Sequence, residues 1–343
     1  MSTMTGASFR ALRVHRTGTG FSRRIEEVPF AALPAGEVLV RVDYSSLNYK
    51  DGLSATGAPG VTREYPHTPG IDAAGTVVES DADEYRSGDQ VIVGGGDFGT
   101  LGWGGFSEYV RVPPSLLTPL PAGLTPREAM IYGTAGLTAA LCVDAVASRR
   151  GAAGTAAAGE PKGNALVTGA TGGVGSFAVA FLSAEGFRVT AVTGKSAEHD
   201  YLRSLGAQDI MSREQATDST GRPLLPGRWQ AVVDTVGGVL LSTAIRSSAR
   251  SAVVAACGNA GGADLALSVY PFILRGVTLV GIDSPFVSQE TRRAVWSMLA
   301  GDWRESLRRG IAIECPLSDL SEWIGRILAG EVRGRVLVRI GSR

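Results

Sequence analysis

A glycine-rich turn is the first feature of the sequence whose residue types and spacing could do chemistry. Residues 169–175 read GATGGVG, after the apolar run ALVT and before the apolar run SFAVAFL. A buried strand, a tight turn and a helix in this order present the free N–H groups of a helix N-terminus to an anion. Read against G-x-G-x-x-G, the turn has Ala170, Gly172 and Gly175 at the three glycine positions. The pattern predicts a diphosphate-binding site formed by Thr171, Gly172, Gly173, Val174 and Gly175.

The end of the next apolar run indicates which dinucleotide such a site would hold. Residues 189–195 read VTAVTGK, a buried strand that ends in Thr193, Gly194 and Lys195. A site for NAD usually has an acidic residue here, bonded to a ribose hydroxyl, but the first acidic residue in this sequence is Glu198. A hydroxyl and a lysine without a carboxylate suit the 2′-phosphate of NADP. The residues therefore predict NADPH as the cofactor, and the alternative that Lys195 is only a solvated loop side chain stays open.

Three further glycine-containing stretches are expected at the same edge of the sheet. They are DTVGG at 234–238, CGNAGG at 257–262 and GIDS at 281–284. Ligands bind outside the carboxyl ends of parallel strands, so these stretches would share one crevice. Their glycines would admit a flat ring close to the backbone, or they serve only as loop glycines.

The cysteines and histidines form no recognisable metal site. Cys142, Cys257 and Cys315 lie far apart and no CxxC pair occurs, so neither a disulfide framework nor a structural zinc site is predicted. The cysteines are expected to be small core residues in a reducing compartment. His67 has no Cys or acid partner at ligand spacing and is expected to be structural. The sequence also lacks G-x-S-x-G and a Cys close to a His, so no nucleophile–base pair is indicated.

The composition bounds the class of protein. The chain has 343 residues, of which 44% are hydrophobic and 19% charged, which predicts a globular protein with two domains. Lys plus Arg equals Asp plus Glu at 33 each, so no basic field indicates nucleic acid or a membrane as a partner. The first residues lack the apolar segment of a signal peptide, and the most apolar helix candidate, interrupted by Asp144, is expected to be too short to span a bilayer. We therefore expect a cytoplasmic protein.

The elements that must position these residues change in character along the chain. From Phe9 to about Val112, short strands alternate with Gly, Pro and Asp turns and predict a small β-barrel or sandwich. Residues 126–147 read as a helix and residues 148–163 as a surface loop. Six strands then predict a doubly wound parallel sheet, namely NALVTG, RVTAVTG, AQDIMS, QAVVDTVG, SAVVAACG and VTLVGIDS. The tail after Pro285 turns helical, ends in the strand RVLVRI and is assigned back to the first domain.

A β-domain, a nucleotide-binding sheet and a C-terminal return together resemble the medium-chain dehydrogenase/reductase superfamily over nearly the whole chain. Within it, the sequence is similar to the zinc-free quinone-reductase group and its YhdH-type, acryloyl-CoA reductase (AcuI-like) branch. Eight segments in the same order carry this resemblance: SSLNYKDGL, PGIDAAGTV, GTAGLTAALCV, VTGATGGVGS, VDTVGG, VAACGNAGG, PFILRGVTLVGIDS and RGRVLV. The resemblance implies a GroES-like β-barrel domain of residues 1–128 and 285–343, and a Rossmann NADPH-binding domain of residues 129–284.

The resemblance also implies roles for single residues. Tyr49 of NYKD would lie against the nicotinamide, and residues 193–195 would hold the adenosine end. Zinc-carrying members have a Cys in the first of the eight segments and Gly-His-Glu in the second, where this chain reads NYKD and PGID, so no metal is expected. The rest of the dinucleotide would be lined by Asn259, Ile273, Ser284 and Arg335.

The reaction implied by the resemblance is hydride transfer from NADPH to an activated C=C bond, with acryloyl-CoA as the expected substrate and propanoyl-CoA as the product. Negative charge would build on the thioester oxygen, so catalysis needs a hydrogen-bond donor there. Tyr49 is the candidate catalytic donor, and the alternative is that its ring only packs against the nicotinamide. Asp51 and Asp72 are expected to fix local turns rather than transfer protons.

Two other functions stay open at this point. One is a reductase of quinones or small enones, and the other is a non-catalytic NADPH-binding structural protein. The expected partners are an enoyl thioester or quinone and a second copy of the chain in a homodimer, with neither nucleic acid nor membrane.

Overall fold

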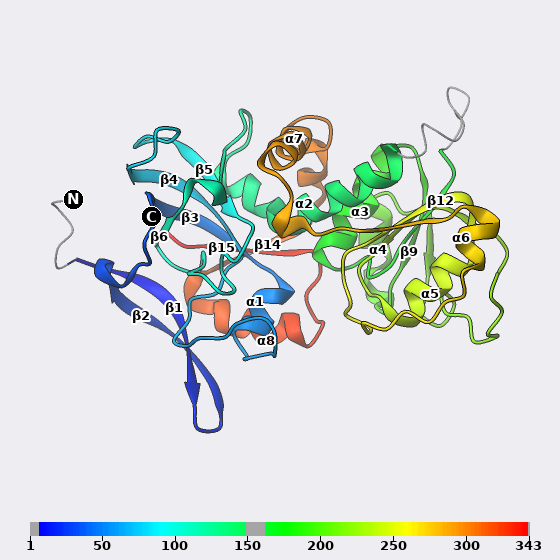
Figure 1. The fold of residues 1–343 in the computed structure, drawn as a ribbon, viewed down its shortest axis with the longest axis horizontal. Coiled ribbons are helices and arrows are strands. Elements are labelled where there is room, and N and C mark those ends of the chain that lie inside the picture. The colour runs from blue at the N-terminus through cyan, green and yellow to red at the C-terminus, as the bar shows by residue number, and fades with distance from the viewer. Residues whose placement is uncertain (1–6, 149–161, 342–343) are drawn as a thin grey trace. The chain divides into compact units, whose positions relative to one another are not determined.

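The chain folds into two compact units, which a computed structural model describes for residues 7–148 and 162–341 (Figure 1). The first unit contains the described residues up to Thr134 together with Ser284–Gly301 and the described residues from Ala312 onward. The second unit contains Ala135–Asp283 and Asp302–Ile311. The sequence places its boundaries at 128/129 and 284/285 and keeps the whole tail in the first domain, whereas the structure groups Asp302–Ile311 with the second unit. Most of the loop expected at 148–163 lies outside the described residues.

The first unit is built on antiparallel strands. One sheet has the order β14-β15-β3-β4-β5-β7, with β6 paired to β3, and β1 and β2 form a separate hairpin. Valines of β3 and β6 at alternate positions line the core of this unit. The strands are β1 (Ser8–Thr17), β2 (Gly20–Pro29), β3 (Val38–Leu47), β4 (Asp72–Ser80), β5 (Gln90–Gly94), β6 (Tyr109–Val112), β7 (Leu117–Pro119), β14 (Ala312–Pro316) and β15 (Arg335–Arg339).

Three helices belong wholly to the first unit: α1 (Tyr49–Ser54), α7 (Gln289–Ala300) and α8 (Leu320–Leu328). Helix α2 (Pro126–Ser148) begins there and is interrupted by Gly133, whose φ of 50° and ψ of −155° are not helical. A Cβ at Gly133 would lie 2.5 Å from Ser46 Oγ and 2.6 Å from Asp72 Oδ2. Only glycine therefore lets the backbone pass so close to these polar groups.

Helix α2 is also long and apolar. By length and composition it could cross a membrane. The sequence instead predicts a segment too short to do so, because Asp144 interrupts its apolar run. However, 78% of the most apolar stretch of this helix is buried inside the protein, as in the core helix of a globular domain.

The second unit is a six-stranded parallel sheet in the order β10-β9-β8-β11-β12-β13. The predicted doubly wound sheet is confirmed, because the chain moves from β8 to one edge and from β11 to the other. Right-handed crossovers then place α3 and α5 on opposite faces, as Figure 1 shows. The strands are β8 (Asn164–Val167), β9 (Arg188–Val192), β10 (Asp209–Met211), β11 (Trp229–Asp234), β12 (Ser248–Ala256) and β13 (Thr278–Gly281); the helices are α3 (Gly173–Ala184), α4 (His199–Ser204), α5 (Gly238–Arg246) and α6 (Tyr270–Arg275).

Candidate cofactor and active site

The predicted diphosphate turn joins the carboxyl end of β8 to the first turn of α3. A Cβ at Gly175 would lie 2.3 Å from the carbonyl oxygen of Gly169, so this glycine is required for the close packing of helix and strand. At Gly172 the nearest atom to a Cβ would be 3.4 Å away, which is an ordinary contact. Packing within the protein therefore does not explain Gly172, and its close approach to a ligand stays a prediction.

The N-terminus of α3 is suited to an anion. Its N-cap residue is Gly172, no side chain caps the first N–H groups, and the first turn contains no acidic residue. The 12-residue helix thus offers unpaired backbone donors and the positive end of its dipole at the carboxyl edge of the sheet.

The ends of β9 and β10 meet next to this turn, because β9 lies between β8 and β10. Thr193 is buried, its N–H donates to the Met211 carbonyl, and its Oγ1 accepts from the N–H of Lys195 at 3.0 Å. A Cβ at Gly194 would lie 3.1 Å from Nε of Arg213, so the Arg213 guanidinium lies against this glycine. The strand ends therefore bring the Thr193 hydroxyl, the backbone of Lys195 and the Arg213 guanidinium together. Hydroxyl and cationic side chains are the donors that a phosphate monoester prefers.

Arg213 is the residue of this group that sequence reasoning missed. It is exposed and follows the predicted strand AQDIMS directly. The signal was its position, since the third strand of such a sheet ends beside the second.

A buried hydrogen-bond network fixes the neighbouring strand end. Asp234 is fully buried, and Oδ1 accepts from Thr168 Oγ1 at 2.7 Å while Oδ2 accepts from the N–H of Gly237 at 2.7 Å. Burial raises the pKa of Asp234 above its ordinary value, against these hydrogen bonds. The Asp234 carboxyl group thereby joins the end of β11 to Thr168, the residue directly before the diphosphate turn at 169–175.

The other two predicted cofactor residues of the second unit lie at different places. Asn259 is exposed in the loop that follows β12, at the carboxyl edge of the sheet. Glycines of this loop are explained by packing, since a Cβ at Gly258 would lie 2.4 Å from the Thr235 carbonyl oxygen. Ile273 lies on α6 with 67% of its surface exposed.

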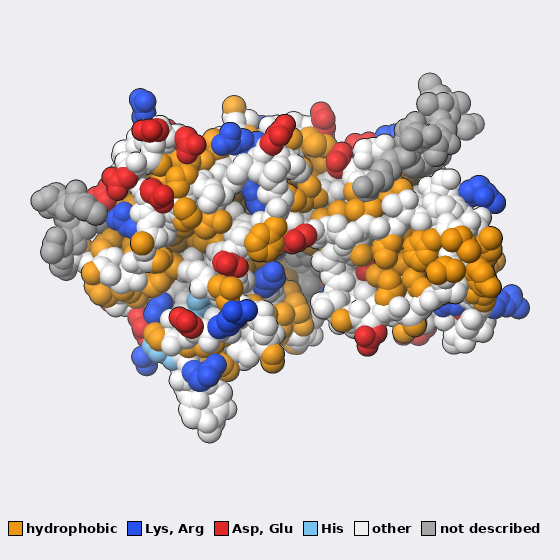
Figure 2. All heavy atoms as spheres, in the orientation of Figure 1, with side chains coloured by type: hydrophobic (Ala, Val, Ile, Leu, Met, Phe, Trp, Pro, Cys, Tyr) orange, Lys and Arg blue, Asp and Glu red, His pale blue; other side chains and the backbone are white. Residues whose placement is uncertain are grey.

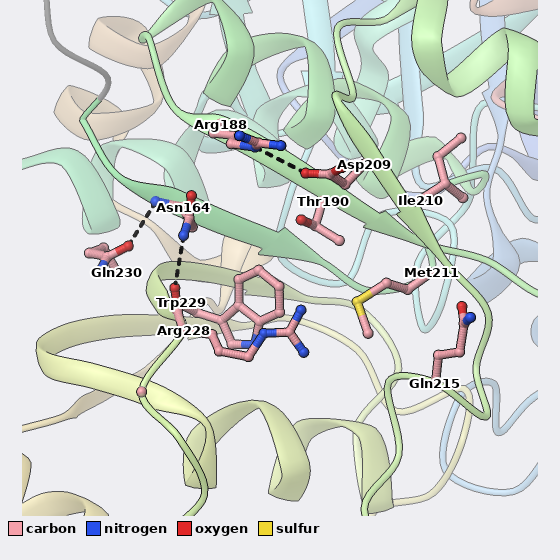
Figure 3. Close-up of a pocket in the computed structure, with 11 residues that line it drawn as sticks. Asn164, Arg188, Thr190, Asp209, Ile210, Met211, Gln215, Arg228, Trp229 and Gln230 are labelled. Carbon is pink, nitrogen blue, oxygen red and sulfur yellow. Dashed lines mark hydrogen bonds and ion pairs between the residues drawn. The ribbon is translucent and has the colours of Figure 1, made fainter.

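A groove on the second unit is not at this edge. Its volume is about 710 Å³, and it lies across β9 and β10 and the amino ends of β8 and β11. Figure 3 shows the Arg188–Asp209 ion pair and the Trp229 ring in its lining. None of the predicted cofactor residues lines this groove, so it is separate from the predicted dinucleotide site.

Tyr49 belongs to the first unit, where it is the first residue of α1. The residue is 48% exposed. Among the described residues, none accepts from or donates to its hydroxyl. The hydroxyl is therefore available to a ligand, although the backbone around it is held firmly.

The buried group that holds this backbone centres on Arg335 and Asp72. Arg335 is 3% exposed, and its guanidinium donates to the carbonyls of Leu47 and Ile131 and to Asn48 Oδ1. It also donates to Ser46 Oγ and lies 3.9 Å from Asp72 Oδ2.

Ser284, the remaining predicted residue, is likewise buried in the first unit, and its carbonyl accepts from Arg292. The structure thus brings Arg335 close to the residue before Tyr49, whereas direct contacts of Arg335 and Ser284 with a dinucleotide stay predictions.

Asp72 of the PGID segment and His67, which lies just before that segment, do not fit a metal site. Asp72 Oδ1 accepts from Ser46 Oγ, and Oδ2 accepts from Asn48 Nδ2 and from the N–H of Thr134. Burial lowers the pKa of His67 to about 4, and its Nε2 lies 3.1 Å from the Gly99 carbonyl oxygen. Within residues 7–148 and 162–341, no three His, Cys, Asp or Glu side chains gather as a metal site would require.

Two family models match the chain, one for each kind of domain. Residues 34–122 match the alcohol dehydrogenase GroES-like domain, and residues 173–301 match the zinc-binding dehydrogenase domain. The predicted combination of a GroES-like domain and a Rossmann domain is confirmed.

Two curated relatives are similar over almost their whole length. The chain is 40% identical to YhfP of Bacillus subtilis, named as a quinone oxidoreductase, over 97% of this chain and 99% of the relative. It is 43% identical to the acrylyl-CoA reductase AcuI of Ruegeria pomeroyi, over 93% and 94%.

Three solved structures share the fold, each with a TM-score of 0.91. YhdH of Salmonella enterica with NADP is 41% identical, over 97% of this chain and 100% of that one. YhdH of Escherichia coli with NADPH is 39% identical, over 96% and 100%. YhfP of Bacillus subtilis with NAD is 40% identical, over 98% and 100%. The two YhdH structures hold NADP or NADPH, which supports the predicted cofactor, whereas the YhfP structure holds NAD. The chain belongs to the medium-chain dehydrogenase/reductase superfamily, in the branch of the YhfP and YhdH quinone-oxidoreductase-like proteins and the AcuI acrylyl-CoA reductases.

Proposed function

We propose that this oxidoreductase uses NADPH to reduce the C=C bond of an enoyl thioester, with acryloyl-CoA converted to propanoyl-CoA. The observation that carries the proposal is the donor set at the ends of β9 and β10, where Lys195 and Arg213 stand in place of a carboxylate. The similarity to AcuI over 93% of the chain supports the thioester as acceptor.

The chain's own residues divide the work between orientation and charge stabilisation. Bound NADPH would supply the hydride for the β-carbon of the acceptor, and a proton from water would complete the reduction at the α-carbon. The N–H groups at the start of α3 and the side chains of Thr193, Lys195 and Arg213 bind its phosphates and so orient it. The Tyr49 hydroxyl donates to the thioester oxygen, on which negative charge develops.

Isotope transfer tests the proposed reaction. With NADPH that carries two deuterium atoms at C4 of the nicotinamide, the propanoyl-CoA product gains one deuterium at the β-carbon, measured by mass spectrometry and NMR. A product labelled at the α-carbon, or no thioester turnover, contradicts the proposal.

A quinone reductase is the second candidate, because YhfP carries that name at 40% identity. Turnover of a benzoquinone without turnover of any enoyl-CoA would favour it. Binding of NADPH with no turnover of either class would favour a non-catalytic protein.

The cofactor preference gives a first prediction. A charge-assisted phosphate contact is worth about 1.5–3 kcal/mol, so NADPH should bind at least about tenfold tighter than NADH in a fluorescence titration. Lys195→Asp should reduce this ratio, because the new carboxylate repels the 2′-phosphate. Arg228→Asp is a matched control, since Arg228 lines the groove at the other edge of the sheet. Equal affinities for the two cofactors, or an unchanged ratio in Lys195→Asp, would contradict the assignment.

We also propose a homodimer formed through the edge strand β13. Figure 2 shows hydrophobic side chains gathered over the region of α6, and the exposed residues there include Val269, Ile273, Leu274 and Leu279. β13 ends the six-stranded sheet, so its outer backbone groups are open to another strand. A second copy of the chain would offer the same apolar face and the same strand edge, as an isologous interface requires.

Charge placed on this edge should therefore split the dimer. Leu279→Glu should give monomers in sedimentation velocity, whereas Ile313→Glu on the other sheet's edge strand, β14, should leave the dimer intact. The two side chains are 36% and 40% exposed, so the substitutions are matched. A monomeric wild type, or a dimer that survives Leu279→Glu, would rule out this interface.

A further inference from the structure

Asp51 is a buried carboxyl group with an unusually complete set of hydrogen bonds. It is 0% exposed, in the first unit, as the third residue of α1. Oδ1 accepts from the N–H groups of Gly70 at 3.1 Å and Ile71 at 2.9 Å. Oδ2 accepts from the N–H of Asn48 at 2.8 Å and from Asn48 Nδ2 at 3.3 Å. A carboxylate with two donors on each oxygen joins the start of α1 to the turn at 70–71.

Asn48 is fixed by a second set of charged groups. Its Oδ1 accepts from Arg335 Nη1 at 3.0 Å, and its Nδ2 donates to Asp72 Oδ2 at 3.1 Å. Tyr49 is the next residue, so the backbone on both sides of it is locked to buried groups. A helix of six residues is too short to be stable without such contacts.

We propose that Asp51 is a positioning residue for Tyr49, because its carboxylate fixes the first turn of α1 and thereby the place of the exposed Tyr49 hydroxyl. The inference rests on the catalytic role proposed for Tyr49. Asp51 itself touches neither substrate nor cofactor in this role, since it is buried behind the backbone that it holds. A misplaced catalytic group loses activity steeply, so the effect should fall on kcat.

The arrangement predicts a dependence on pH. Burial and the Asp72 carboxylate raise the pKa of Asp51 to about 7, against the hydrogen bonds that favour its ionised form. The charged groups that face it among the described residues are Asp72 on β4 and Arg335 on β15. Protonation turns one carboxyl oxygen of Asp51 into an O–H donor, so this oxygen no longer accepts the backbone hydrogen bonds as well. The first turn of α1 is therefore held less firmly, and kcat decreases, as the pH falls through about 7.

Asp51→Asn tests the inference. The amide keeps one oxygen for the N–H groups of residues 70 and 71, but its NH₂ group faces the N–H of Asn48. We expect kcat to fall by roughly ten- to a hundredfold, as for a catalytic group displaced by about 1 Å, with little change in the Kd for NADPH. The decrease of kcat below neutral pH should be absent from the variant. Asp89→Asn is the matched control, because Asp89 also accepts from a backbone N–H, that of Arg86, but in an exposed turn.

A double-substitution cycle separates this inference from the role of Tyr49. If Asp51 acts through Tyr49, Asp51→Asn should cost much less in a Tyr49→Phe background than in the wild type. An impaired Tyr49→Phe variant beside a fully active Asp51→Asn variant, or equal costs in both backgrounds, overturns the positioning role. A fully active Tyr49→Phe variant instead overturns the proposed role of Tyr49.

A label in the wild-type protein keeps the test valid if Asp51→Asn does not fold. With 3-fluorotyrosine at position 49, the ¹⁹F resonance should shift with pH and a midpoint near 7. A resonance that does not move between pH 5.5 and 7.5, a range in which the fluorinated phenol stays protonated, contradicts the proposal if the enzyme stays folded.

Discussion

Tyr49→Phe should lower kcat by roughly thirty- to a thousandfold, about 2–4 kcal/mol of transition-state stabilisation. The lost hydroxyl is the donor that we propose for the thioester oxygen. In the protein, no described residue forms a hydrogen bond with this hydroxyl. The Kd for NADPH should change far less, because the aromatic ring is retained. Steady-state kinetics with acryloyl-CoA and a fluorescence titration with NADPH measure the two quantities.

The reverse pattern would indicate packing alone. In that case Phe would be tolerated at position 49, and Ala would weaken cofactor binding. Tyr270→Phe is the matched control, since Tyr270 is 45% exposed and Tyr49 is 48% exposed. The melting temperatures of all variants show whether the fold is intact.

Arg335→Met should reduce the free energy of unfolding by about 3–5 kcal/mol, the usual cost when one partner of a buried ion pair is removed. The substitution leaves the Asp72 carboxylate buried without a cation and leaves Asn48 Oδ1 and two backbone carbonyls without their donor. The midpoint of urea unfolding measures the loss.

Arg339→Met on the same strand is the control for this prediction. Its guanidinium is 48% exposed and lies 3.7 Å from Glu314 Oε1 at the surface. An exposed pair contributes about 0–1 kcal/mol, so this variant should unfold close to the wild type. Equal losses in the two variants would contradict the importance of the buried group around Arg335.

The sheet of the second unit could be predicted well from the sequence. Its central strands β8, β9 and β11 are buried on both faces and therefore appear as continuous apolar runs between glycine-containing turns. All six predicted strands occur, with ends shifted by a few residues.

The first unit was less predictable, because some of its strands have no apolar pattern. β2 reads GFSRRIEEVP and buries only Val28, so its own sequence does not indicate a strand. It forms because it pairs with β1 along its whole length, from Ser8 opposite Pro29 to Thr17 opposite Gly20. The helix predicted at 126–147 is present, but its interruption at Gly133 depends on side chains far away in the sequence.

In the candidate site, too, some residues could be predicted from the sequence and others could not. The glycine turn and Thr193 could be predicted because a local strand–turn–helix pattern determines where they lie. Arg213 was missed because its place beside Gly194 depends on the pairing of β10 with β9. The contacts of Asp51 with the N–H groups of Gly70 and Ile71 join segments about 20 residues apart, which no local pattern indicates.

The reduction of an enoyl thioester by NADPH is tested most directly by one set of steady-state assays. Acryloyl-CoA, crotonoyl-CoA and a benzoquinone are compared as acceptors with the same enzyme, each with NADPH. We predict the largest kcat/KM for acryloyl-CoA. A larger kcat/KM for the benzoquinone than for either thioester would contradict the proposed function.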